Sequence, residues 1–194
     1  MGQQGEPVHQ SHMEALTRMV QPDRTDVLRS AAAGDEIAFQ RLIAEHHDDM
    51  RRVCSYVTRD VALAEEATQA AWVVAWKKIG TVRDPERLRS WLVSVAVNEA
   101  KQLLRKRRTR ARLEVATDAS REPGGLDPAT GVAGLDLRSA MARLGADDRA
   151  LLAMRYVAGF DSNELAAAAG FTPAATRQRL KRLLDRLRKE LTDA

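Results

Sequence analysis

The sequence contains a single cysteine, Cys54, among its 194 residues. One cysteine excludes an intramolecular disulfide and a zinc site built from several cysteines, and it is compatible with a reducing compartment. No apolar run approaches the roughly 20 residues that a membrane-spanning helix needs, and the N-terminus lacks the apolar core of a signal peptide. We therefore expect a soluble, cytoplasmic protein.

Motifs of common catalytic chemistries are missing too. There is no Gly-rich phosphate loop, no H-E-x-x-H zinc motif and no nucleophile elbow. Adjacent histidines such as His46 and His47 point apart on a helix, which argues against a metal site. The neighbouring acids Asp147 and Asp148 suit the exposed start of a helix, where the helix dipole favours negative charge. We expect no enzyme, no cofactor and no bound metal.

Strand signals are also absent, because no segment alternates apolar and polar residues with a period of two. Apolar residues recur instead at helical spacing, so the sequence predicts an all-α fold. We expect a mobile N-terminal extension over residues 1–25, a helical domain over 26–112, a flexible linker over 113–134 and a second helical domain over 135–194. The linker segment is rich in Gly, Pro, Ala and acidic residues.

In the first domain, the Asp84-Pro85 pair separates the third expected helix from a long fourth one. This fourth helix begins apolar and ends strongly basic, in "LLRKRRTRAR". Trp72 and Trp76 recur at i, i+4 among apolar neighbours, which favours core packing over stacking on exposed bases. Cys54 lies in an apolar helical pattern that favours a buried, inert thiol.

A helix-turn-helix is predicted in the second domain. Asp161 and Glu164 form a capping-box pattern, Gly170 suits a left-handed helix end, and Thr172-Pro173 cap and begin the next helix. On that next helix, leucines form one stripe at positions 180, 183, 184, 187 and 191. The layout is typical of a DNA-recognition helix packed through its leucines.

A second, polar stripe lies on the other side of this helix and includes Ala174, Arg177, Gln178, Lys181, Arg182 and Arg188. Arg, Lys and Gln side chains can read guanine or adenine in the major groove. Arg179 and Arg186 flank the stripe and better suit phosphates. The alternative is that these residues form an ordinary solvated surface; the capped helix before them favours DNA binding.

The C-terminal segment "LLAMRYVAGFDSNELAAAAGFTPAATRQRLKRLLDRLRKEL" resembles the DNA-binding domain of bacterial sigma factors of the extracytoplasmic-function (ECF) group in the sigma-70 family. The segments "GDEIAFQRLIAEHH", "AEEATQAAWVVAW" and "SWLVSVAVNEAKQLLRKRR" resemble, in the same order, conserved segments of the N-terminal half of that family. The likeness extends over about residues 27–192.

The resemblance implies two promoter contacts and several partners. The −10 element would be bound by Asn98, Lys101, Gln102, Arg105, Lys106 and Arg108, and the −35 element by Arg177, Gln178, Arg179, Lys181 and Arg182. Glu66 and Gln69 fall where the family contacts the β′ clamp helices of core RNA polymerase, and the second domain would sit on the β flap. An anti-sigma factor is a further possible partner.

This chain departs from the family pattern at Ala67, Ala70, Ala175, Thr176 and Gln178, which affects the expected promoter sequence and polymerase affinity. We expect an alternative sigma factor that binds core polymerase and directs promoter recognition and opening. One rival is a free-standing helix-turn-helix repressor or activator. A second is a recombinase-like enzyme, which should carry a catalytic Ser or Tyr with clustered Arg in its N-terminal half; none is evident.

Overall fold

The computed structural model describes residues 23–114 and 139–192, and every secondary-structure element within these ranges is helical. The expected all-α fold is confirmed. Nearly all of the expected N-terminal extension and of the expected linker lie outside the described residues. None of the helices within the described ranges is both long and apolar enough to cross a lipid bilayer.

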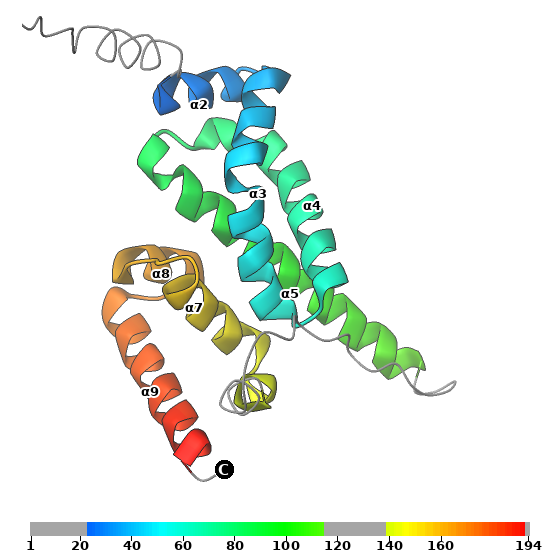
Figure 1. Ribbon diagram of the computed structural model, residues 1–194, viewed down its shortest axis with the longest axis vertical. Coiled ribbons are helices and arrows are strands. Elements are labelled where there is room, and N and C mark those ends of the chain that lie inside the picture. Colours follow the sequence, from blue (N-terminus) through cyan, green and yellow to red (C-terminus); the bar gives the residue numbers. More distant parts are fainter. Residues whose placement is uncertain (1–22, 115–138, 193–194) are drawn as a thin grey trace, which may run out of the picture.

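The first group of helices comprises α2 (Arg24–Ala32), α3 (Glu36–Thr58), α4 (Val61–Lys78) and α5 (Leu88–Glu114). Short 3-10 turns, Ile79–Thr81 and Pro85–Arg87, connect α4 to α5. The helices α3 and α4 form an antiparallel pair, α5 packs across both, and the last turns of α5 extend beyond the bundle (Figure 1). The basic end predicted for this domain therefore projects from it.

Aspartates begin most of these helices, as N-cap residues should. The carboxylate of Asp35 accepts hydrogen bonds from the backbone N–H groups of Ile37 and Ala38 at 2.8 and 3.1 Å, and Asp60 accepts one from Leu63 at 3.1 Å. The α3 helix is followed by its C-cap residue Arg59, which has a left-handed φ of 59°. The boundaries of α3 and α4 are thus set locally.

The core of this group contains Trp72, whose ring meets that of Phe39 edge to face at 5.6 Å. Trp76 also contacts Phe39, at 4.8 Å, but it remains 40% exposed, so its core packing is only partial. Cys54 is fully buried, and this burial raises the pKa of its thiol to about 12 despite a hydrogen bond with Thr68. The prediction of a buried thiol is confirmed.

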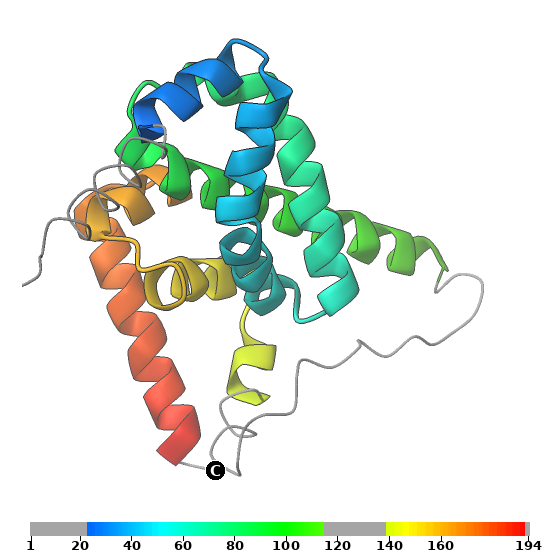
Figure 2. The same cartoon turned by 45° about the horizontal axis from the view of Figure 1, so that its top comes forward.

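The second group comprises helical residues 139–143, α7 (Ala146–Tyr156), α8 (Ser162–Ala169) and α9 (Pro173–Thr192). The α7 helix is buried nearly all round, because the consecutive residues 149–154 are all buried. It packs on α9 and α8 from its own group and on α3 and α5 from the first group (Figure 2).

The two groups share one continuous hydrophobic core. Leu92 and Val97 of α5 belong to the same buried cluster as Leu151, Met154 and Phe160 of the second group. The physical reason is that α7 is apolar nearly all round, so the face that α8 and α9 do not cover is buried against α3 and α5. The division of the chain into independent domains stays a prediction.

Candidate nucleic-acid interface

The helix-turn-helix forms through the local signals that the sequence carries. The carboxylate of Asp161 accepts hydrogen bonds from the backbone of Asn163 and Glu164 at 2.7 and 2.8 Å, and the Glu164 carboxylate accepts one from the Asp161 N–H at 2.9 Å. This is the complete capping box that the sequence predicts. Gly170 ends α8 with a left-handed φ of 71°, as expected.

The α9 helix begins at Pro173, with the Thr172 hydroxyl accepting a hydrogen bond from the Ala175 N–H at 3.2 Å. Thr176, Leu183 and Leu187 are buried on its inner face. The predicted inward leucine stripe is confirmed at these central positions, whereas Leu191 at the end of the helix is 39% exposed.

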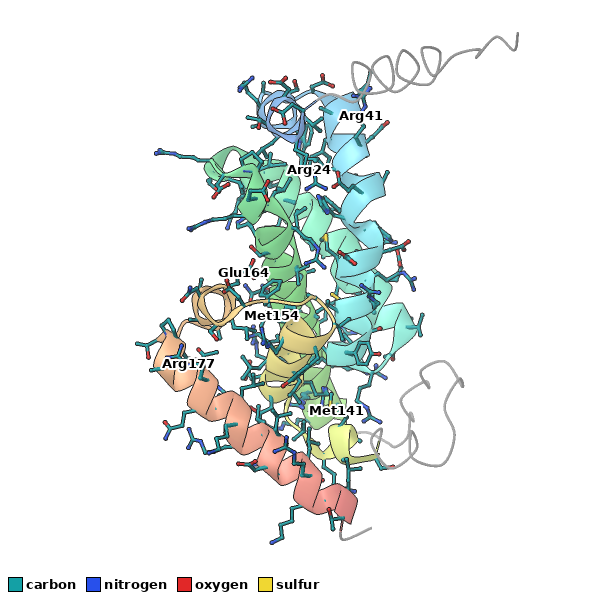
Figure 3. All side chains as sticks on the ribbon, turned by 60° about the vertical axis from the view of Figure 1, so that its left-hand side comes forward. Arg24, Arg41, Met141, Met154, Glu164 and Arg177 are labelled. Carbon is teal, nitrogen blue, oxygen red and sulfur yellow. The ribbon has the colours of Figure 1, made fainter. Side chains whose placement is uncertain are left out.

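The opposite face of α9 is open to solvent, and it carries Arg177, Gln178, Lys181 and Arg182, all exposed. Arg177 lies near the start of α9, close to the α8 helix that carries Glu164 (Figure 3). Four of the five side chains predicted to meet the −35 element are thus brought together on one accessible face. Their role stays a prediction.

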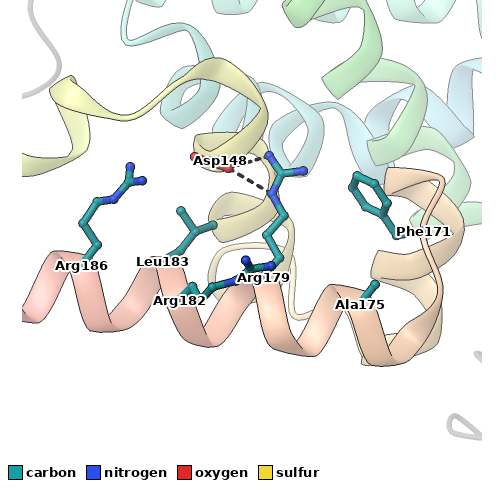
Figure 4. A pocket seen from close by; sticks show the side chains of 7 residues that line it. All are labelled: Asp148, Phe171, Ala175, Arg179, Arg182, Leu183 and Arg186. Atoms are coloured by element: carbon teal, nitrogen blue, oxygen red, sulfur yellow. Dashed lines mark hydrogen bonds and ion pairs between the residues drawn. The ribbon is translucent and has the colours of Figure 1, made fainter.

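Arg179, the fifth of these residues, turns toward α7 instead. Its Nη2 and Nε atoms donate to Asp148 Oδ1 at 2.6 and 3.1 Å, and its guanidinium lies 5.4 Å from the centre of the Phe171 ring (Figure 4). Its side chain is 33% exposed. A phosphate approaching Arg179 would have to share the guanidinium with Asp148.

A cavity of about 470 Å³ lies beside this ion pair, between α9 and the start of α7. Figure 4 shows Arg179, Arg182 and Arg186 along one wall of the cavity, with Phe171 and Ala175 at one end. Three guanidinium groups and one carboxylate give the cavity a positive balance. This surface is suited to an anion such as a DNA phosphate.

The residues predicted to meet the −10 element lie along the second half of α5. Asn98 is exposed, as are Arg105, Lys106 and Arg108, while Lys101 and Gln102 are half-buried. The Gln102 amide donates to Glu99 Oε1 at 3.1 Å on the same helix. The set follows one helix rather than forming an enclosed pocket.

Lys101 makes a contact that the sequence does not signal. Its ammonium group lies 2.9 Å from Asp147 Oδ1, in the first turn of α7, and its side chain is only 21% exposed. The hydrogen bond from Lys101 lowers the pKa of the Asp147 carboxyl, and the nearby Arg179 and Arg105 act in the same direction. The start of α7 therefore contacts the predicted −10 surface.

The predicted polymerase contacts, Glu66 and Gln69, lie one turn apart on α4 and are both exposed. The Gln69 amide donates to Glu65 Oε1 at 3.0 Å. The exposed Val73 and Trp76 continue this side of α4 toward its C-terminus. The surface is accessible to a partner protein.

Two arginines that hold the helix groups together were missed by sequence reasoning. Arg149, only 5% exposed, donates from Nε to the Val57 carbonyl at 2.8 Å and from Nη1 to the Leu144 carbonyl at 2.5 Å. Arg89 donates to the Ala158 carbonyl at 2.7 Å and to Asp49 Oδ2 at 2.8 Å. No sequence motif marks either residue, because each bonds a backbone carbonyl of the other helix group, far away in the chain.

Burial lowers the pKa of two basic side chains, Arg149 and His46. Desolvation lowers the pKa of Arg149, and the nearby cations Arg59 and Arg108 lower it further. Desolvation also lowers the pKa of His46, against the opposing effect of Glu45. Within the described residues, no group of three or more His, Cys, Asp or Glu side chains is arranged to hold a metal ion.

A helix-turn-helix with an exposed basic second helix, together with a basic end on α5, is typical of DNA-binding proteins. Residues 42–110, from α3 to most of α5, match the family model for sigma-70 region 2. Two curated relatives that the chain covers almost completely are RNA polymerase sigma factors. The chain is 31% identical to the RNA polymerase sigma factor CarQ of Myxococcus xanthus over 162 residues, 81% of this chain and 91% of CarQ.

The ECF RNA polymerase sigma factor SigL of Mycobacterium tuberculosis is likewise 31% identical, over 171 residues that span 84% of this chain and 95% of SigL. The probable RNA polymerase sigma factor RfaY of Xanthomonas campestris is 30% identical over 190 residues. That match covers 93% of this chain but only 46% of RfaY, so the chain spans about half the length of this relative.

Solved structures support the same fold. The sigma factor RpoE of Bartonella quintana, in complex with the anti-sigma factor NepR, matches with a TM-score of 0.66 and 21% identity, over 79% of this chain and 96% of RpoE. CnrH, in complex with the cytosolic domain of CnrY, matches with a TM-score of 0.64 and 25% identity, over 88% of this chain and 97% of CnrH.

The chain belongs to the RNA polymerase sigma factors of the ECF group. Its role is that of an alternative sigma factor in transcription initiation, and the rival hypothesis of a free-standing repressor or activator is not favoured.

Proposed function

We propose that this sigma factor binds core RNA polymerase and reads a promoter at two places, with the first helix group on the −10 element and the second on the −35 element. The observation that carries this proposal is that one chain exposes two polar, basic helix faces, one around Asn98 on α5 and one around Arg177 on α9. Two weak readers on one chain reinforce each other through a raised effective concentration.

At the −35 element, Arg177, Gln178, Lys181 and Arg182 read base edges in the major groove. Each good two-point contact contributes roughly 1–3 kcal/mol of discrimination between bases. Arg179 contacts a phosphate from the edge of the same surface, in competition with Asp148, which accepts from it at 2.6 Å. The exposed face of α9 thus reads the bases, and Arg179 at its edge positions the helix on the DNA backbone.

At the −10 element, Asn98 holds a base flipped out of the stack, which is the role that the resemblance to the ECF family implies. Flipping a base costs a few kcal/mol, which hydrogen bonds to the exposed Asn98 amide help to offset. The neighbouring cations Lys101, Arg105, Lys106 and Arg108, together with Gln102, hold the backbone of the separated strand. Each phosphate that they neutralise adds to the salt dependence of binding.

The polymerase contacts involve the other faces of the chain. Glu66 and Gln69, exposed on α4, contact the β′ clamp helices, and the second helix group sits on the β flap. A further partner is an anti-sigma protein, since RpoE and CnrH have both been solved with bound partner proteins. The chain works in the cytoplasm and performs no catalysis of its own.

Run-off transcription with purified core polymerase tests this function. The full chain should bind core polymerase in a pull-down and should direct a transcript from its cognate promoter, whereas core polymerase alone should not. Glu66→Ala with Gln69→Ala should weaken the pull-down; Arg29→Ala on α2, which is exposed and outside the predicted contacts, serves as the control. Tight binding to a defined duplex without polymerase, and no initiation with it, would argue for a free-standing regulator.

A further inference from the structure

The start of α7 covers part of the predicted −10 surface of α5. Ser94, Val97 and Lys101 of α5 share a cavity wall with Leu151 and Met154 of α7. Asn98, one position further around α5, remains exposed. The second helix group thus leaves the proposed base-holding residue open and covers the side of α5 that carries Lys101, a proposed contact of the strand backbone.

The contact between Asp147 and Lys101 has the chemistry of a protein–phosphate contact. An ammonium nitrogen and a carboxylate oxygen lie 2.9 Å apart, at the distance that a lysine adopts on a phosphate oxygen. Lys101, Arg105, Arg108 and Arg179 line a cavity of about 360 Å³ around Asp147 and Asp148. Cations from both helix groups therefore converge on a pair of acidic side chains.

This arrangement is held by contacts away from the DNA-binding residues. Arg149 bonds the Val57 carbonyl at 2.8 Å, and Arg89 bonds the Ala158 carbonyl at 2.7 Å. Val57 is in the last turn of α3, where the helix dipole places negative partial charge, so a cation from α7 is favoured there. The buried guanidinium of Arg149 donates to two carbonyl oxygens and lies close to the cations Arg59 and Arg108, whose charge disfavours its own.

We propose that this packing is an autoinhibited state, in which the Asp147 carboxylate occupies the place of a promoter phosphate on Lys101 and the start of α7 blocks the strand's path. The inference rests on the proposed function, because it takes Lys101 as a ligand of the −10 strand. A −10 strand can bind fully only after α7 leaves α5, which requires Arg149 to leave the end of α3. Asp148 differs from Asp147, since its partner Arg179 belongs to the same helix group and stays with it on opening.

The test measures binding of the full-length chain, without polymerase, to a fluorescent single-stranded oligonucleotide carrying the −10 sequence. Asp147→Asn should bind about 2- to 5-fold more tightly, as expected for the loss of one partly exposed competing ion pair. Asp148→Asn makes the same change in charge one residue away and is the matched control. Equal tightening in both variants would show that the change in net charge alone strengthens binding, and it would overturn the proposal.

The Arg149→Met variant distinguishes the proposed autoinhibited state from a general effect of net charge more sharply than Asp147→Asn does. Removal of a cation should weaken DNA binding if only net charge matters, whereas release of an autoinhibited state should tighten it, here by at least about 10-fold from the loss of buried hydrogen bonds to a charged group. Small-angle scattering should show a larger radius of gyration for this variant. If Arg149→Met fails to fold by circular dichroism, Asp147→Asn against Asp148→Asn decides the outcome alone.

Run-off transcription by the wild-type chain keeps the two proposals apart. If the wild type initiates but neither Asp147→Asn nor a folded Arg149→Met tightens oligonucleotide binding, the autoinhibition is wrong and the sigma-factor function stands. If the wild type does not initiate although both variants tighten binding, the proposed function fails, and only the covering of a nucleic-acid-binding side of α5 by α7 is upheld.

Discussion

The guanidinium of Arg149 lies buried against the last turn of α3, 2.8 Å from the carbonyl oxygen of Val57, a residue 92 positions earlier in the chain. A second bond, to the Leu144 carbonyl, ties the same side chain to the loop before α7. One side chain therefore joins α7 of the second group to α3 of the first.

Replacement of Arg149 by Met should lower the free energy of unfolding by about 1–3 kcal/mol, because two buried carbonyl groups lose a charged donor. Arg149→Lys keeps the charge and one bond, so its loss should be smaller. Urea denaturation measures the difference, and hydrogen exchange at residues 54–58 should rise most in the Met variant. An unchanged stability would mean that the cost of burying the cation cancels its hydrogen bonds.

The Asp60 carboxylate predicts a pH effect on stability. Burial alone would raise its pKa, but the N–H of Leu63 and the guanidinium of Arg107, 3.0 Å away, together lower the pKa below its ordinary value of 3.8. Because the folded pKa is the lower one, the stabilisation is complete above the unfolded pKa and is lost as the pH falls through the folded pKa.

Asp60→Asn should therefore flatten the acid side of the stability profile. Asn still caps α4 and accepts from Arg107, but it does not titrate in this range. Between pH 5 and pH 3, wild-type unfolding free energies from urea titrations should fall more than those of the Asn variant. Parallel profiles for the two proteins would show that Asp60 is not the group responsible.

Substitution of Arg177 or Lys181 by Ala should weaken recognition of the −35 element by the holoenzyme. A base contact should cost roughly 1–3 kcal/mol and relax preference at one position. A phosphate contact should instead reduce the slope of log K against log salt by about 0.9. Gel-shift titrations at several salt concentrations distinguish the two roles. Arg29→Ala should change neither, and an unchanged −35 preference in both variants would reject the assignment.

Asn98→Ala should impair promoter opening more than initial docking. The side chain is exposed, so protein stability should change by less than about 0.5 kcal/mol. Permanganate footprinting reports opening, and filter binding on a duplex promoter at low temperature reports docking. Equal loss at both steps would show that Asn98 acts as a general DNA contact rather than as part of a base-holding site.

The helix-turn-helix was predictable from the sequence because each of its signals acts within a few residues. The Asp161–Glu164 capping box, the left-handed Gly170 and the leucine stripe of α9 all depend on interactions between near neighbours along the chain. The exposed face of α9 follows from the same periodicity. Successive residues lie about 100° apart around a helix, so only residues three or four positions apart share a face. The all-α fold class followed in the same way.

Trp76 and Arg179 show where prediction from the spacing of residues along one helix fails. The spacing of Trp76 indicates a core residue, yet its ring stays 40% exposed at the edge of the α3–α4 pair. Arg179 belongs to a basic helix surface by sequence, but its guanidinium bonds Asp148 of α7. In each case, the outcome depends on which helix lies alongside, and spacing along one helix does not encode that neighbour.

By itself, the sequence determined the helices, their caps and the polar face of α9, because these follow from hydrogen bonds and periodicities within a few turns. Only the tertiary structure decided that α7 packs on α3 and α5, that Arg149 is buried at the end of α3 and that Asp147 meets Lys101. Those contacts join residues far apart in the chain, and their energies come from apolar area and charge brought together only when the helices pack.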